Sequence, residues 1–164
     1  MMDLKGNRFV GIVILTLLYP MIGYWVHIPN PMLPGAVLAL NMIFPVLAGY
    51  FYGPGAGAMT GGLGTALSSL LTASLFDGLA IFPHAVMGLA AGWVGKNHSA
   101  QLTALTIILG HALNIIFFLR FEMIDIQRSQ VFETILGLTT ETIIDIVAIV
   151  LIIMVLKLWQ GRIE

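Results

Sequence analysis

Long apolar stretches alternate along the chain with short segments that are polar or rich in glycine and proline. A helix needs about 20 apolar residues to cross the roughly 30 Å hydrocarbon layer of a bilayer, because each residue advances it by about 1.5 Å. The interruptions divide the sequence into six such stretches, over residues 9–26, 35–52, 55–75, 79–95, 102–119 and 134–159. We therefore predict an all-α integral membrane protein whose six transmembrane helices form a single membrane domain over residues 1–164.

The first apolar stretch follows Lys5 and Arg8, an arrangement that signal peptides also show. However, residues 9–26 are longer than the apolar core of a typical signal peptide, and no small-x-small cleavage site follows them. A proline-rich segment, residues 29–34, comes next. We interpret the stretch as a retained first transmembrane helix.

Composition excludes several classes of protein. Hydrophobic residues make up 59% of the sequence and charged residues 9%, and the mean hydropathy is +0.98. A soluble domain needs about a quarter of its residues charged to cover its surface. The net charge of −1 provides no basic footprint for nucleic acid. The absence of cysteine excludes disulfides, thiolate nucleophiles and cysteine metal sites.

Basic residues between the predicted helices indicate their orientation. With the N-terminus in the cytoplasm, five basic residues fall on the inner side and two, Arg120 and Arg128, on the outer side. This distribution satisfies the positive-inside rule, whereas the opposite orientation violates it. We therefore predict that both termini are cytoplasmic and that the charged segment 120–133 is external.

The predicted orientation gives the depth of each polar side chain within its helix. By this measure, the polar side chains gather in the outer half of the bundle. By contrast, residues 146–156, at the inner end of the last helix, include no polar side chain. The candidates for contact with a solute from outside are Asn41, His84, His111, Asn114, Glu141 and Asp145.

Glu141 and Asp145 are the two carboxylates of the last predicted helix. An ionised carboxylate near the middle of a bilayer costs roughly 2.5–3.5 kcal/mol on insertion scales. The spacing of four places both on one helix face. Two interpretations stay open: an internally hydrogen-bonded pair, or a cavity open to the outside in which carboxylates and imidazoles hold a polar solute.

His84 and His111 allow the same two interpretations, a hydrogen-bonded core residue or a ligand contact. Neither belongs to a His-x-x-x-His or His-Glu-x-x-His pattern, so the sequence predicts no preformed zinc site. We expect no bound metal and no cofactor.

The glycine-rich stretch 53–64 does not have the spacing of a phosphate-binding loop, and no Lys-Ser or Lys-Thr follows it. Instead Gly53, Gly57 and Gly61 repeat every four residues, and Gly88 and Gly92 repeat the pattern in the fourth predicted helix. Small residues at this spacing let helices approach closely in lipid. We therefore predict tight helix packing here rather than ligand contact.

The segment 24–34 between the first two predicted helices contains Tyr24, Trp25 and three prolines. The aromatic residues are typical of the belt at a membrane interface. Alternatively, the stiff segment forms a lid above the polar half of the bundle.

Several segments together resemble the substrate-binding S components of energy-coupling factor (ECF) transporters, and the likeness covers nearly the whole chain. They are the Pro-Asn-Pro after the first helix, residues 33–35 (Leu-Pro-Gly), residues 48–57 (Ala-Gly-Tyr-Phe-Tyr-Gly-Pro-Gly-Ala-Gly) and residues 82–92 (Phe-Pro-His-Ala-Val-Met-Gly-Leu-Ala-Ala-Gly). The resemblance implies a multi-pass protein of the prokaryotic cytoplasmic (inner) membrane that captures a small vitamin or micronutrient from outside. It also implies contact with membrane lipid and delivery with an ECF membrane scaffold subunit and two cytoplasmic ATPases, or transport by the chain alone.

The ligand site of this family uses the first outer loop and the outer halves of helices four to six. At the matching positions, the resemblance makes Trp25, His27, His84, His111, Asn114 and Glu141 ligand candidates. The nickel and cobalt members have a histidine directly after the initiator methionine, where this chain has Met2, so a vitamin-like solute fits better than a metal ion. The cobalamin members that rely on a cysteine also match poorly.

Two other classes of function are also compatible with a small apolar bundle. The first is a structural six-helix membrane protein, like a small subunit of the rod-shape machinery, which binds no ligand. The second is an intramembrane enzyme in which Glu141 and His111 activate water, but neither a nucleophile nor a paired metal motif supports it. We expect a transport component and not an enzyme.

Overall fold

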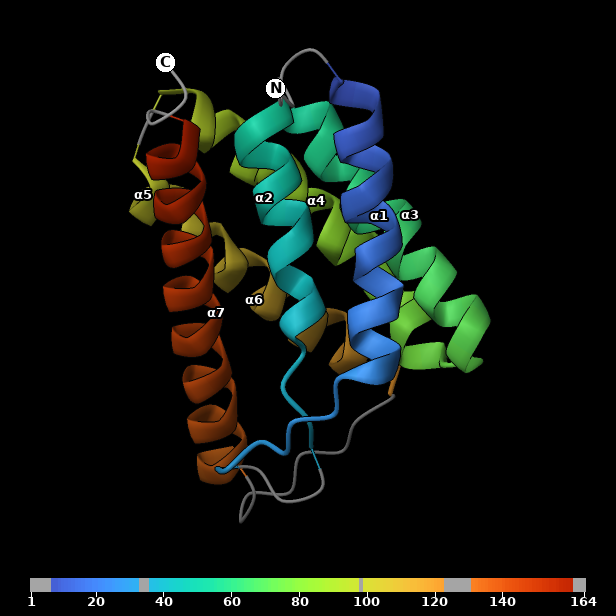
Figure 1. Ribbon diagram of the computed structural model, residues 1–164. Coiled ribbons are helices and arrows are strands. Elements are labelled where there is room, and N and C mark those ends of the chain that lie inside the picture. Colours follow the sequence, from blue (N-terminus) through green and yellow to red (C-terminus); the bar gives the residue numbers. More distant parts are fainter. Residues whose placement is uncertain (1–6, 33–35, 98, 123–130, 161–164) are drawn as a thin grey trace.

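The computed structural model describes residues 7–32, 36–97, 99–122 and 131–160. These residues are mainly helical, and one isolated antiparallel bridge joins Pro29 to Val37. The helices are α1 (Arg8–Trp25), α2 (Ile43–Tyr52), α3 (Pro54–Thr72), α4 (Leu75–Asn97), α5 (Ala100–Ala104), α6 (Thr106–Arg120) and α7 (Val131–Gln160), with a short 3₁₀ turn η1 (Leu40–Met42) before α2 (Figure 1). The predicted all-helical architecture is therefore confirmed for the described residues.

The second predicted helix begins later than the sequence pattern indicates. We expected a helix over residues 35–52, but residues 36–39 are not helical and Gly35 lies outside the described residues. The Asn30 N–H donates to the Ala36 carbonyl at 2.9 Å, and the Leu38 N–H donates to the Ile28 carbonyl at 2.8 Å. Because these backbone groups pair across the loop, they are not available to a first helical turn.

The turn between α3 and α4 also lies earlier than predicted. The predicted stretches 55–75 and 79–95 leave the turn at residues 76–78, which include Asp77 and Gly78. Instead Ala73 makes the turn in the left-handed region, with a φ of 52°, and α4 begins at Leu75. The Ser74 hydroxyl accepts the Asp77 N–H at 3.2 Å. An N-terminal hydroxyl cap and an acidic residue in the first turn stabilise a helix start, so Asp77 belongs to the helix rather than to the turn.

The fifth predicted helix, over residues 102–119, corresponds to α5 and α6, which together form one apolar span over Ala100–Arg120. The two helices meet at Leu105. Close to this junction the Thr106 hydroxyl donates to the Thr103 carbonyl at 2.7 Å. Hydroxyls that bond back to a helix carbonyl commonly bend the helix, which accounts for the break.

Gly53 connects α2 to α3 with a φ of 92°, a conformation that favours glycine, and Pro54 follows at the first position of α3. Beyond this turn the glycine packing prediction is confirmed. A Cβ on Gly57 would overlap the Gly88 carbonyl, and one on Gly61 would overlap the His84 carbonyl. The backbones of α3 and α4 therefore touch at their glycines, as small-residue faces allow.

The start of α1 and the end of α7 lie at the same end of the bundle (Figure 1). At the opposite end, the segment after α1 crosses to the beginning of α7 (Figure 1). There the Asn30 side chain donates to the Gly137 carbonyl at 3.0 Å. This crossing segment, residues 26–39 as far as they are described, ties α1 and α2 to α7.

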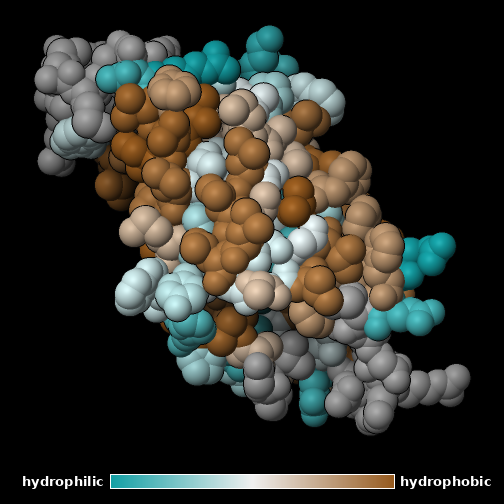
Figure 2. Space-filling model, turned by 90° about the vertical axis from the view of Figure 1, so that its right-hand side faces the viewer, coloured by the Kyte–Doolittle hydropathy of each residue, from teal (hydrophilic) through white to brown (hydrophobic). Residues whose placement is uncertain are grey.

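Among the described residues, four helical spans are long and apolar enough to cross a membrane: α1, α4, the joined α5 and α6, and α7. The helix over Leu40–Tyr52 is apolar but shorter. Many large hydrophobic side chains lie on the surface, among them Leu70, Trp93 and Val155. Figure 2 shows such side chains covering most of the middle of one face, with hydrophilic groups nearer its ends. This surface is suited to contact with lipid acyl chains.

Candidate functional site

One narrow stripe of α7 faces the rest of the bundle. Its buried residues recur every fourth position: Gly137, Glu141, Asp145, Ile149 and Ile153. The stripe changes character along the helix, because its first half presents two carboxylates to the bundle and its second half presents only aliphatic side chains. The polar part begins at the end of the bundle where the crossing segment passes.

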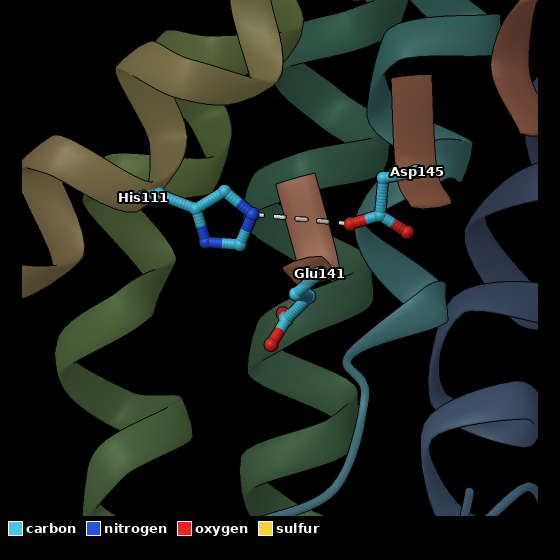
Figure 3. Close-up of side chains that lie close together, drawn as sticks. All are labelled: His111, Glu141 and Asp145. Carbon is cyan, nitrogen blue, oxygen red and sulfur yellow. Dashed lines mark ion pairs between the residues drawn. The ribbon is translucent and has the colours of Figure 1, made fainter. Parts of the chain in front are cut away.

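Asp145 of α7 faces His111 of α6. Asp145 is 0% exposed and His111 is 7% exposed. The Nε2 atom of His111 lies 3.8 Å from Oδ2 of Asp145, and the imidazole ring points at this carboxylate (Figure 3). Within the part of the chain that the structure describes, Nε2 of His111 and both carboxylate oxygens of Asp145 have no hydrogen-bond partner. Buried polar atoms without protein partners are rare in folded proteins, and a bound water, ion or ligand commonly completes them.

Glu141 lies one helical turn from Asp145 and completes the cluster in Figure 3. Its Oε1 atom accepts the Ala39 N–H at 3.3 Å, so the crossing segment holds this carboxylate. One donor atom from each of His111, Glu141 and Asp145 lies within 4.8 Å of the other two. We call these three residues the α6–α7 cluster.

Asn114 lies next to this cluster on α6, one turn after His111. Its Nδ2 atom is 2.9 Å from Nε2 of His84, whereas Oδ1 is buried and has no partner among the described residues. Rotating the amide by 180° would exchange Oδ1 and Nδ2, and one of the two atoms would still have no partner. In either orientation one polar atom of Asn114 pairs with His84 and the other is free to meet a ligand.

His84 of α4 is surrounded differently. Its Nδ1 atom lies 2.6 Å from the Tyr19 hydroxyl and 2.9 Å from the Thr65 hydroxyl, and Asn114 occupies Nε2. These partners come from α1, α3 and α6, so one imidazole links four helices. Both of its ring nitrogens already have protein partners, which is the environment of a hydrogen-bonded core residue.

The crossing segment is fixed to α7 through Asn30. This side chain is buried, donates to the Gly137 carbonyl and accepts the Met32 N–H at 3.0 Å. Asn30 therefore fastens the segment to Gly137, and Ala39 fastens it to the Glu141 carboxylate one helical turn further along α7. The segment therefore closes one end of the α6–α7 cluster.

The family of ECF-type riboflavin transporter S components has a sequence model that matches residues 4–159. This match covers nearly the whole chain. The chain belongs to this family. No curated protein matches the chain significantly, and no solved structure does.

Membership confirms the resemblance that the sequence motifs carry. As an S component, this is a multi-pass membrane protein of vitamin-type substrate transport, and the family is not an enzyme family. The apolar surface and the four candidate spans agree with that class.

The other predicted site residues of this S component lie apart from the α6–α7 cluster. Trp25 ends α1, is 75% exposed and meets Tyr24 edge-on at 5.6 Å between ring centroids. His27 lies exposed on the crossing segment. Asn41 lies in η1 with its amide close to Gly23 of α1. No hydrogen bond or ion pair among the described residues joins any of these three to His111 or Asp145.

Sequence reasoning missed Tyr19, Thr65 and Asn30, which make the hydrogen bonds that position the polar residues of this S component. The signal for Asn30 was its place between two prolines, which fix the backbone on either side. Tyr19 and Thr65 gave no such signal, because a tyrosine or threonine in an apolar helix is common. Only the packing of α1 and α3 on α4 brings their hydroxyls to His84.

Proposed function

We propose that this S component captures riboflavin from the outer face of the prokaryotic cytoplasmic membrane and delivers it inward. The observation that carries the proposal is the set of buried polar atoms without partners on α6 and α7, namely His111 Nε2, Asn114 Oδ1 and both Asp145 oxygens. In an apolar bundle such atoms are costly unless a bound solute completes their hydrogen bonds. The choice of riboflavin among vitamins rests on the family to which the chain belongs.

The chemistry of riboflavin suits these groups. Its ring carries an imide edge, in which an N–H lies between two carbonyls, and its side chain carries several hydroxyls. A side-chain amide such as that of Asn114 is complementary to an imide edge, because each offers one donor and one acceptor. The carboxylates of Glu141 and Asp145 accept hydrogen bonds from an N–H or a hydroxyl, and a carboxylate acceptor strengthens such bonds.

The end of α1 and the crossing segment complete the proposed site. Trp25, the last residue of α1, and His27, on the crossing segment, form the approach to the cluster. Asn30 and Ala39 hold the segment on α7, so it encloses a solute bound near Glu141. Release of these two hydrogen bonds would open the path between the cluster and the outside. Asn41 and His84 contribute by fixing the helices that surround the solute.

Orientation is part of the proposal, because the cluster must face the side from which the vitamin comes. Both termini are cytoplasmic and the segment 120–133 is external, of which residues 123–130 lie outside the described residues. A cysteine at Gln127 should react with a membrane-impermeant thiol reagent in intact cells, and one at Asn97, which is exposed at the end of α4, should not. The opposite labelling would place the cluster on the wrong face for capture.

Energy for uptake comes from partner proteins in this proposal. The sequence has no nucleotide-binding motif, so ATP acts through a membrane scaffold subunit and two cytoplasmic ATPases, unless the chain transports its solute alone. Uptake of riboflavin by vesicles that contain the chain with and without these subunits separates the two modes.

Mass spectrometry of small molecules that co-purify with the detergent-solubilised protein tests the cargo directly. We expect riboflavin, and we expect its fluorescence to be quenched on titration with the emptied protein. If a different vitamin co-purifies, the proposed cargo is wrong and the proposed transport function stands. A protein that carries and binds no small molecule would instead support the structural membrane scaffold.

A further inference from the structure

The α6–α7 cluster combines one imidazole and two carboxylates, and its three side chains are each more than nine-tenths buried. From its donor atoms, their spacing and their charge, we infer that His111, Glu141 and Asp145 bind one divalent transition-metal cation, such as Zn²⁺. The spacing of these residues along the sequence does not suggest a metal site, because His111 is 30 positions from Glu141. The packing of α6 against α7 brings them together.

The distance between His111 and Asp145 supports an ion rather than a direct hydrogen bond. At 3.8 Å, Nε2 and Oδ2 are too far apart for a hydrogen bond, which needs about 2.7–3.2 Å. A bridging water at about 2.8 Å from each atom would typically hold them about 4.5 Å apart. Two ligands of one Zn²⁺, at bonds of about 2.0–2.2 Å in tetrahedral geometry, lie about 3.4 Å apart. The observed separation is nearest to this last value.

Glu141 is the adaptable ligand of the three. The donor atoms lie within 4.8 Å of one another, so binding has to draw the most distant one inward by up to about 1.4 Å to reach the tetrahedral spacing of about 3.4 Å. The glutamate side chain has the rotatable bonds for this movement. One of its oxygens accepts the Ala39 N–H, which fixes the orientation of the carboxylate and leaves the second oxygen for the ion. The first oxygen keeps a lone pair that can accept a hydrogen bond from the solute.

Charge balance points to a cation of charge two. Among the residues that the structure describes, the lysine and arginine side chains lie at helix ends: Arg8 begins α1, Lys96 and Lys157 lie in the last turns of α4 and α7, and Arg120 ends α6. None is placed to neutralise two carboxylates in the middle of α7. Riboflavin is neutral, so the proposed cargo supplies no positive charge either. A divalent cation neutralises both carboxylates at once.

The donor set selects the kind of cation. Imidazole together with carboxylates suits zinc and its first-row neighbours, whereas magnesium and calcium prefer sites made of oxygen alone. Three protein ligands leave a coordination position open, which water or an oxygen of the solute fills. The site thus lies at the floor of the proposed vitamin site, next to Asn114.

The inference uses the proposed function only for the neutrality of the cargo, and it is tested on cargo-free protein. The experiment is isothermal titration of ZnCl₂ into the full chain in detergent after treatment with a chelator. We expect one Zn²⁺ per chain, with affinity at least a hundredfold lower in Asp145→Asn, since a neutral amide replaces a charged ligand. The matched control is Asp77→Asn, which removes a carboxylate that hydrogen-bonds Ser68 and Thr72 outside the cluster, and it should bind as the wild type does.

If the wild type binds no Zn²⁺, or if the wild type and Asp145→Asn bind Zn²⁺ with equal affinity, the inference is overturned. Helicity measured by circular dichroism establishes that each variant is folded. If Asp145→Asn does not fold, Glu141→Gln takes its place, with an expected loss of at least tenfold. Riboflavin is titrated into the same wild-type sample. If the protein binds riboflavin but not Zn²⁺, only the proposed metal site is wrong. If it binds Zn²⁺ but not riboflavin, only the proposed cargo is wrong.

Discussion

His84 on α4 and His111 on α6 are both more than nine-tenths buried, yet the protein surrounds them differently. His84 has a hydroxyl from α1, a hydroxyl from α3 and an amide from α6 against its two ring nitrogens. His111 faces one carboxylate at 3.8 Å, and its Nε2 atom has no hydrogen-bond partner in the described part of the chain. The same type of side chain thus occupies two different environments in one bundle.

The difference separates polar residues whose hydrogen bonds hold the helices together from polar residues that are available to bind a ligand. A buried polar group whose partners are all protein groups stabilises one arrangement of helices. A buried polar group without such partners lowers stability, and it is retained where binding of another group recovers the cost. The His84 network therefore belongs to the architecture, and the α6–α7 cluster belongs to the proposed site.

The largest effect is expected from Gly61→Leu, which disrupts the contact between α3 and α4 and with it the His84 network. Any side chain at Gly61 overlaps the His84 carbonyl, so α3 and α4 must separate and the His84 network must break. We expect destabilisation by about 3 kcal/mol or more, and little monodisperse protein on size-exclusion chromatography. Gly55→Leu is the control, because a Cβ there meets nothing within 4 Å. Equal loss of folded protein in both variants would contradict the packing account.

Glu141→Gln should affect binding and spare the fold. The amide keeps the shape of the side chain but removes the charge, and a charge-assisted hydrogen bond contributes roughly 1.5–3 kcal/mol. Riboflavin affinity should therefore fall about ten- to a hundredfold in a fluorescence titration at matched helicity. Unchanged affinity would assign Glu141 to internal structure.

His84→Ala should lower stability, whereas His111→Ala should leave it nearly unchanged. Removing His84 deletes the hydrogen bond of its Nδ1 atom with the Tyr19 hydroxyl. Hydrogen bonds between membrane helices contribute about 0.6 kcal/mol on average and at most about 1.7 kcal/mol. We expect a loss of about 1–2 kcal/mol for His84→Ala, measured as thermal unfolding in detergent. Equal destabilisation by the two substitutions would remove the distinction between the two histidines.

Asn30→Ala should have the smallest effect of the four, because it removes one tether of the crossing segment. The hydrogen bond to the Gly137 carbonyl is lost, at about 1 kcal/mol, so α7 and the segment separate more readily. We expect riboflavin to dissociate about fivefold faster in stopped-flow fluorescence, with a loss of stability of no more than about 1 kcal/mol. A dissociation rate equal to that of the wild type would show that this tether does not retain the solute.

Much of the fold followed from the sequence, because lipid imposes strong rules on apolar stretches. The helices α1, α3 and α7 and the glycine contacts of α3 with α4 were predictable from turn signals and the spacing of small residues. The late start of η1 and α2 was not, because it depends on backbone pairing between residues 28–30 and 36–38 across the loop. Likewise, a hydroxyl cap at Ser74 outweighed the turn signal of Asp77 and Gly78.

The candidate site was predictable in part. The spacing of Glu141 and Asp145 placed both carboxylates on one face, and the structure confirms that this is the buried stripe of α7. The sequence treated His84 and His111 alike, because helical depth says nothing about partners on other helices. Only the packing of Tyr19 and Thr65 against His84 separates the two histidines.

A crystal structure of the chain with riboflavin bound tests the central claim most directly, because it shows which buried polar groups the solute pairs with. The account predicts riboflavin polar atoms within about 2.7–3.2 Å of the Asn114 amide and the Glu141 carboxylate, while His84 keeps Tyr19 and Thr65. Riboflavin bound elsewhere, or bound through His84 with the α6–α7 cluster still without partners, would contradict it.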